Sequence, residues 1–227
     1  MRHLLVLSLL LCLACAPATD HDPDPYAARD PLEALNRPIF TLNLMLDRYA
    51  LRHVATLYRQ IPIEGRSGIR HMLTNLSEPA NMLGCVLQLD PEGALTAFWR
   101  FALNSSVGFL GWRDFAGENG LPYEKRRFAS TLEHYGMGEG NYLVLPLFGP
   151  SHTRERVGLI ADWFTDPLGI VLNWTQTLTY ATTQGISRRD EQDKTIRVLY
   201  YQSVDPYTAT RAAYLQNRLF KQQNGHK

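Results

Sequence analysis

The chain has 227 residues, with 23 Lys and Arg against 22 Asp and Glu. This balance excludes the strongly basic surface of a nucleic-acid-binding protein and gives no support to a broad attraction to anionic lipid. Hydrophobic residues make up 45% of the chain, which is ordinary for a globular protein and enough to bury a core.

Residues 1–14 are predicted to be a lipoprotein signal peptide. Arg2 provides a short positive start, and the apolar run of residues 4–13 is too short to span a bilayer. Small Ala14 precedes Cys15, which is the pattern of a bacterial lipoprotein signal. Cys15 is therefore predicted to be the acylated first residue of the mature chain, and Ala16 favours sorting to the outer membrane. The alternative is an ordinary signal peptide that releases a soluble secreted protein.

Residues 15–29 are rich in Pro and Asp and are predicted to form a lipidated flexible tether, followed by a folded domain over residues 30–227. Once Cys12 is removed with the signal and Cys15 is acylated, only Cys85 remains. An intramolecular disulfide is then impossible, and Cys85 is expected to be a small buried hydrophobic residue.

Asp-Pro pairs mark the expected helix starts, because an Asp side chain accepts N–H groups of the first turn and Pro suits the first helical position. The pairs begin at Asp30, Asp90, Asp166 and Asp205. Glu33 follows Asp30 by three residues, as in a capping box, and Ser187 with Asp190 is a weaker version of the same signal.

Apolar residues recur at helical spacing through most of the domain. Such sets lie in residues 46–58, 69–76, 95–102, 196–200 and 206–222. The only strand-like run is residues 142–148, which Pro146 interrupts. The pattern therefore predicts a mainly α fold.

Two stretches, residues 101–112 and residues 167–187, carry no charge. The second is long enough to cross a bilayer, but it contains too many Asn, Gln and Thr residues for a simple membrane helix. Both stretches could be buried helices of a soluble core. Alternatively, both could lie at a membrane interface, with Trp112, Trp163 and Trp174 at headgroup depth.

The sequence gives little support to an enzyme. It contains no HExxH or CxxC metal motif, no GxSxG nucleophile elbow and no GxxxxGKS/T phosphate loop. A triad of Ser130, His134 and an aspartate can be drawn, but a structural role for His134 is favoured, and nothing basic adjoins Cys85 to activate its thiol. We therefore predict no catalytic residue, no metal and no cofactor, with an envelope hydrolase as the enzymatic alternative.

Two groups of glycines indicate special backbone shapes. Gly108 and Gly111 lie three residues apart, where helices approach closely or the chain bends. Gly136, Gly138 and Gly140 alternate ahead of an apolar arm, and no basic residue follows to suit a phosphate cradle. These three glycines are predicted to be the hinges of a gating loop.

Short motifs also follow one another in a specific order over residues 30–220. They are Asp30-Pro-Leu-Glu with Asn36-Arg37 and Phe40; Asn75-Leu76, Glu78-Pro79 and Leu87-Gln88; Arg100-Phe101 with Asn104; Gly108, Gly111 and Asp114; Phe128 with Thr131-Leu132; His134-Tyr-Gly-Met-Gly138 through Leu145-Pro146 to Gly149, then Arg154; and Asp205-Pro206-Tyr207, Arg211, Tyr214 and Phe220. In this order they resemble the MlaA (VacJ) family of outer-membrane lipoproteins.

The resemblance implies a single helical, ring-like domain embedded in the inner leaflet of the outer membrane, with an amphipathic channel through its middle. The implied role is to take mislocalised phospholipid from the outer leaflet and pass it to a periplasmic lipid-carrier protein, which maintains lipid asymmetry. Outer-membrane porin trimers are the implied partners. The rival interpretation is a porin-associated scaffold without a channel of its own. The residues expected to line the channel or face the membrane are Phe101, Asn104, Gly108, Gly111, Trp112, Trp163 and Trp174.

Three positions depart from the family pattern. Leu89 stands where Gly is expected, and His53 and Asn141 stand where Pro is expected. These changes bear on loop stiffness and on docking of the carrier rather than on the fold.

Overall fold

The computed structural model describes residues 30–224, which are mainly helical and divide into two compact units. In the described residues, unit 1 comprises 30–52, 139–153 and 191–224, and unit 2 comprises 53–138 and 154–190. The predicted mainly α class is confirmed. Cys15 and the predicted tether lie outside the described residues.

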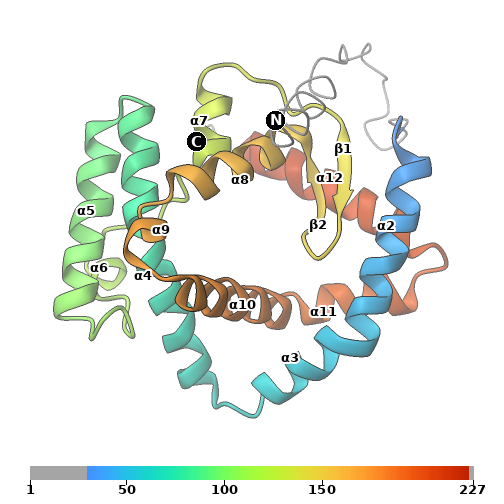
Figure 1. Cartoon of the computed structure of the whole chain (residues 1–227), viewed down its shortest axis with the longest axis horizontal. Helices are drawn as coiled ribbons and strands as arrows, with labels where there is room; N and C mark the ends of the chain where they lie inside the picture. Colours follow the sequence, from blue (N-terminus) through green and yellow to red (C-terminus); the bar gives the residue numbers. More distant parts are fainter. Residues whose placement is uncertain (1–29, 225–227) are drawn as a thin grey trace. The chain divides into compact units, whose positions relative to one another are not determined.

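Unit 1 combines helices with a single β-hairpin (Figure 1). Its elements are α2 (Glu33–Leu46), the π-helical segment η1 (Asp47–Leu51), β1 (Tyr142–Leu145), β2 (Gly149–His152), α11 (Asp193–Ile196), the π-helical segment η2 (Arg197–Gln202) and α12 (Pro206–Asn224). The strand-like run is thus half of an antiparallel hairpin, in which Tyr142 pairs with His152 and Leu145 with Gly149.

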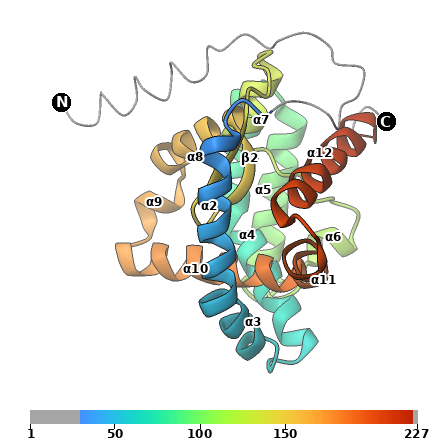
Figure 2. The same ribbon diagram turned by 90° about the vertical axis from the view of Figure 1, so that its right-hand side faces the viewer.

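Unit 2 is built from helices. They are α3 (Arg52–Tyr58), which begins at the boundary, α4 (Ile63–Leu87), α5 (Pro91–Ser106), α6 (Phe115–Glu118), α7 (Phe128–His134), α8 (Thr153–Thr165), α9 (Leu168–Val171) and α10 (Trp174–Glu191). Figures 1 and 2 show α4 and α5 side by side, and these two helices form the main contact of the unit.

The Asp-Pro pairs act at helix starts as the sequence predicts, with differences in detail. Asp90 is the N-cap of α5 and accepts a hydrogen bond from the Gly93 N–H at 2.9 Å. The capping-box prediction at Asp30 is wrong, because α2 begins two residues after Pro31 and Glu33 pairs with Arg37 instead. The helix start predicted from Ser187 and Asp190 is also wrong, because α10 continues through both positions.

The exposed edge of β1 is covered by two asparagines of α2. Asn36 donates to the Tyr142 carbonyl at 3.2 Å and accepts from the Val144 N–H at 2.9 Å. Two helical turns later, Asn43 makes the same pair of bonds to the Leu145 carbonyl and the Leu147 N–H. Side-chain amides therefore satisfy the strand where a neighbouring strand is missing, which protects an otherwise open edge.

The apolar core of unit 1 lies between this hairpin and the helices. Phe40, Tyr142, Val144 and Tyr207 are its buried members, and the ring of Phe40 meets that of Tyr207 edge to face at 5.7 Å between centroids. Edge-to-face pairs of this kind add to the stabilisation from buried area.

Candidate functional site

Helix α5 in unit 2 carries its hydrophobic side chains outward and its polar side chains inward. Leu95, Phe98 and Trp99, which the sequence pattern places on one apolar face, are all exposed. Arg100 and Asn104 occupy the buried face. The exposure of three large apolar side chains, opposite a buried arginine and asparagine, departs from the usual distribution of apolar residues inside and charged residues outside.

Arg100 is the centre of the polar core of unit 2. It is 1% exposed and donates from Nε to Glu78 Oε1 at 2.5 Å, from Nη2 to Asp114 Oδ1 at 3.0 Å and from Nη1 to the Leu121 carbonyl. Burial raises the pKa of Glu78, and the hydrogen bond from Arg100 opposes that rise. One guanidinium therefore ties α4, α5, the start of α6 and the chain that follows α6.

The turn after α5 projects two apolar side chains from a backbone that is held at several points. Phe109 and Leu110 are 80% and 70% exposed, and both have φ in the left-handed region, at 53° and 59°. The turn closes because the Gly111 N–H donates to the Asn104 carbonyl at 2.7 Å. Strained conformations of this kind persist only where the surroundings impose them, and they concentrate at functional sites.

Asn104, Gly108 and Gly111 are buried, so the prediction that they present channel or membrane surface is wrong. They shape the turn instead. Asn104 donates to Asp114 Oδ1 at 2.9 Å and accepts from the Ala116 N–H at 2.8 Å. Gly111 has φ of 88°, and a Cβ there would lie 2.6 Å from the Asn75 Cβ, so only glycine fits.

The second uncharged stretch is exposed rather than buried, which contradicts the alternative of a buried core helix. Within it, Trp174 is 78% exposed and Leu178 is 53% exposed, and Trp163 and Phe164 just before it in α8 are 72% and 84% exposed. Phe101 and Trp112 are also exposed, so all four aromatic candidates present surface. In α10, every residue from 174 to 179 is exposed, although none is charged.

The threonines of α10 bond to their own helix. The hydroxyls of Thr177, Thr179, Thr182 and Thr183 each donate to the carbonyl four residues earlier, at 2.7–3.1 Å. A hydroxyl satisfied in this way does not need water, so the helix can present methyl groups to an apolar environment. The many polar residues of this segment are therefore compatible with contact to lipid.

Lys125 is an exposed cation of unit 2. Although the side chain reaches solvent, desolvation by the surrounding protein atoms lowers the pKa of Lys125, and the nearby charges of Arg188 and Arg127 lower it further. An accessible cation with reduced solvation attracts an anion more strongly than a fully solvated one.

The glycine segment before β1, residues 136–140, has open space around its first two glycines and close packing at its third. A Cβ added at Gly136 or Gly138 would meet nothing within 4 Å, whereas one at Gly140 would lie 2.8 Å from the Thr153 Cβ. Gly136 and Gly140 have φ of 83° and 72°, which glycine adopts without strain. The geometry leaves Gly136 and Gly138 as candidate hinges and makes Gly140 a close-packing position. Their role in a gate stays a prediction.

The residues weighed for catalysis are not brought together. His134 is exposed, and the Ser130 hydroxyl donates to the Arg127 carbonyl at 2.7 Å rather than to a histidine. Cys85 is 2% exposed, and burial raises its pKa, as expected of a buried hydrophobic residue rather than a nucleophile. Within residues 30–224, no group of three His, Cys, Asp or Glu side chains is placed to hold a metal ion.

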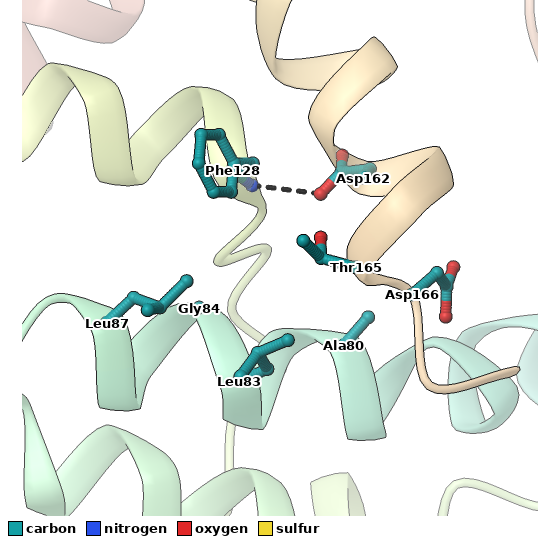
Figure 3. Close-up of a pocket in the computed structure, with 8 residues that line it drawn as sticks. All are labelled: Ala80, Leu83, Gly84, Leu87, Phe128, Asp162, Thr165 and Asp166. Carbon is teal, nitrogen blue, oxygen red and sulfur yellow. Dashed lines mark hydrogen bonds between the residues drawn. The ribbon is translucent and has the colours of Figure 1, made fainter. Parts of the chain in front are cut away.

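A small pocket of unit 2 is too narrow to hold a lipid (Figure 3). It lies between α4, the start of α7 and the end of α8, and it is lined by Ala80, Leu83, Gly84, Leu87, Phe128, Asp162, Thr165 and Asp166. Its volume of about 10 Å³ suits at most a single water molecule. Both carboxylates are engaged, since Arg127 pairs with Asp162 at 3.4 Å and with Asp166 at 3.2 Å. We therefore take as the candidate functional surface the exposed apolar side chains of α5, of the turn after it and of residues 163–178, and not this pocket.

Among residues 30–224, none of the helices combines the length and the apolar character needed to cross a membrane.

The chain matches the family model described as MlaA lipoprotein over residues 28–221. It is 36% identical over 224 residues to the intermembrane phospholipid transport system lipoprotein MlaA of Escherichia coli (strain K12), covering 95% of this chain and 86% of that protein. The protein of the same name from Haemophilus influenzae is 29% identical over 236 residues, covering 97% of this chain and 89% of that protein. A solved structure described as the structural basis for maintenance of bacterial outer membrane lipid asymmetry matches with a TM-score of 0.71 and 36% identity, covering 85% of this chain and 98% of that chain.

Proposed function

The chain belongs to the MlaA lipoprotein family, and on that premise we propose that it removes mislocalised phospholipid from the outer leaflet of the outer membrane. It passes this phospholipid to a periplasmic lipid-carrier protein, so that lipid asymmetry is maintained. The process needs no covalent chemistry, and we propose that the protein is not an enzyme. Porin trimers are the proposed partners within the membrane.

The reversed burial of unit 2 is the observation that carries the proposal. Large apolar side chains are exposed over two uncharged segments, while Arg100, Glu78 and Asn104 are buried. Exposed patches of this kind mark surfaces that bind protein or membrane. Lipid suits them here because the hydroxyls of α10 are bonded within the helix and do not need a polar partner.

The free energy available from burying the exposed apolar side chains in lipid indicates that the domain contributes to its own membrane attachment. Phe109, Leu110, Trp163, Phe164 and Trp174 are each at least 70% exposed. Full burial of one such side chain contributes about 1.5–3 kcal/mol, so insertion of all five would contribute on the order of 10 kcal/mol. The acyl chains proposed on Cys15 add about 0.8 kcal/mol per buried CH₂. The lipid anchor then chiefly directs the protein to the correct membrane, and the exposed segments set its depth.

A phospholipid headgroup needs a polar contact while its tails need apolar ones. Lys125 supplies an exposed cation in unit 2, the unit that also carries the apolar surface. We propose that the lipid phosphate contacts this cation during transfer.

Lipidomics of the protein extracted from native outer membrane tests the proposal. Phospholipid should co-purify in excess over an unrelated outer-membrane lipoprotein, and Lys125→Gln should reduce that excess several-fold. Lys194→Gln, which removes an exposed cation of unit 1, is the matched control and should leave the excess unchanged. Absence of bound phospholipid, together with co-purification of porin trimers, would overturn the proposal in favour of the scaffold.

A further inference from the structure

Gly138 lies between two residues that are each held by an arginine. On its N-terminal side, Arg154 Nη1 donates to the Met137 carbonyl at 2.9 Å, within unit 2. On its C-terminal side, Arg218 Nε donates to Glu139 Oε1 at 2.9 Å, within unit 1. Gly138 is also the last residue of unit 2 before the chain enters unit 1. The freedom of this glycine therefore depends on what holds its two neighbours.

Glu139 is fixed by groups from α12 and from β2. Both Nε and Nη2 of Arg218 donate to the same oxygen, Glu139 Oε1. The other oxygen lies 3.7 Å from Nε2 of His152, whose Nδ1 lies 3.0 Å from the Tyr214 hydroxyl. Tyr214 and Arg218 are four residues apart on α12, so both face the same side of the helix.

The two arginine contacts differ in how readily they can open. The side chain of Arg154 is 6% exposed, whereas those of Glu139 and Arg218 are 27% and 19% exposed. Water can reach the separated Glu139 and Arg218 side chains, which reduces the free energy needed to part them. Gly140, the next residue, is already packed against Thr153. Of the two arginine contacts beside Gly138, the Glu139–Arg218 contact is therefore the one that water can reach. It lies between Gly138, which has open space around it, and Gly140, which is closely packed.

We propose that the Glu139–Arg218 ion pair is a clasp that holds the C-terminal end of the glycine segment on α12, and that the segment opens only when this pair separates. The inference rests on the proposed lipid transfer and on the predicted role of Gly136 and Gly138 as hinges of a gating loop. Glu139 and Arg218 are positioning residues in this account and do not themselves contact lipid.

Hydrogen exchange of the full lipidated chain in detergent tests the clasp. Arg218→Gln and Glu139→Gln should each speed exchange at residues 137–140 by about tenfold, because each removes a charge-assisted hydrogen bond. The effect of the double variant should be smaller than the combined effects of the two single variants, since both substitutions break the same contact. Exchange at Val144, whose N–H donates to Asn36, should stay unchanged and shows that the hairpin remains folded.

Arg197→Gln is the matched control, because it removes another arginine–carboxylate pair of unit 1, the 2.8 Å contact between Arg197 Nε and Asp193 Oδ2. It should not alter exchange at residues 137–140. Unchanged exchange in Arg218→Gln and Glu139→Gln, or additive effects in the double variant, would overturn the clasp. Faster exchange without any change in outer-leaflet phospholipid would support the clasp and overturn the gating role predicted for Gly136 and Gly138.

Discussion

Replacing Arg100 by Met should destabilise unit 2 strongly and in a pH-dependent way. Methionine keeps much of the side-chain length but loses the hydrogen bonds to Glu78, Asp114 and the Leu121 carbonyl. Glu78 is 1% exposed and would retain only the bond from Asn81 Nδ2 at 3.1 Å. Breaking a buried ion pair by removing one partner costs about 3–5 kcal/mol, because the remaining charge is left without compensation.

That cost corresponds to a drop in melting temperature of roughly 6–20 °C for a chain of this size. Burial already raises the pKa of Glu78, and loss of Arg100 removes the hydrogen bond that opposes the rise. A carboxyl group with a raised folded pKa favours the folded state below its unfolded pKa of about 4.3, and this advantage is lost as the pH rises towards the folded pKa. The deficit of Arg100→Met relative to the native chain should therefore be smaller at pH 5 than at pH 8.

The assay is thermal unfolding of the full chain in detergent, followed by far-ultraviolet circular dichroism at both pH values. Adding Glu78→Gln to Arg100→Met should recover part of the lost stability, because the buried charge is then removed as well. A melting temperature within about 2 °C of the native value would refute the assignment of Arg100 as the centre of the polar core. A deficit that is the same at pH 5 and pH 8 would refute the account of the Glu78 charge.

Three further outcomes are expected. Gly138→Pro should stiffen the candidate hinge and lower resistance of the cells to detergent, whereas unchanged outer-leaflet phospholipid in this variant would remove the gate assignment. Leu89→Gly should be neutral or stabilising by about 1 kcal/mol, because Leu89 has φ of 56° and is 81% exposed; clear destabilisation in thermal unfolding would contradict this. Cys15→Ser should misdirect the protein in membrane fractionation, and correct sorting of that variant would argue against the lipoprotein signal.

Local signals in the sequence predicted the helical class and several helix starts. Asp90 caps α5 and Gly111 takes a φ of 88° in the turn after it, and both features depend on backbone near in sequence. The close approach of Asn75, which also requires glycine at position 111, does not. Leu89 adopts the left-handed conformation that the expected glycine would take, so the departure from the family pattern changes the residue without changing the backbone.

The orientation of the apolar faces could not be predicted. Helical periodicity places Leu95, Phe98 and Trp99 on one side of α5, but it does not say whether that side meets a protein core or lipid. The structure decides the matter by burying Arg100 and Asn104 on the opposite side. The surface role assigned to Asn104 was wrong for the same reason.

Contacts between segments that are distant in the sequence could not be predicted either. The amides of Asn36 and Asn43 cover β1 across more than a hundred residues, and Arg218 lies 79 residues from Glu139. No spacing rule links such positions, because they meet only after the hairpin has packed against α2 and α12.

The central claim is that the protein lowers the amount of phospholipid in the outer leaflet. Its most direct test is labelling of phosphatidylethanolamine on intact cells with a membrane-impermeant amine reagent, with and without the gene. The account predicts more labelled lipid in cells that lack the gene, a return to the native level when the chain is restored, and only partial return with Lys125→Gln. Equal labelling in the presence and absence of the gene would contradict the account.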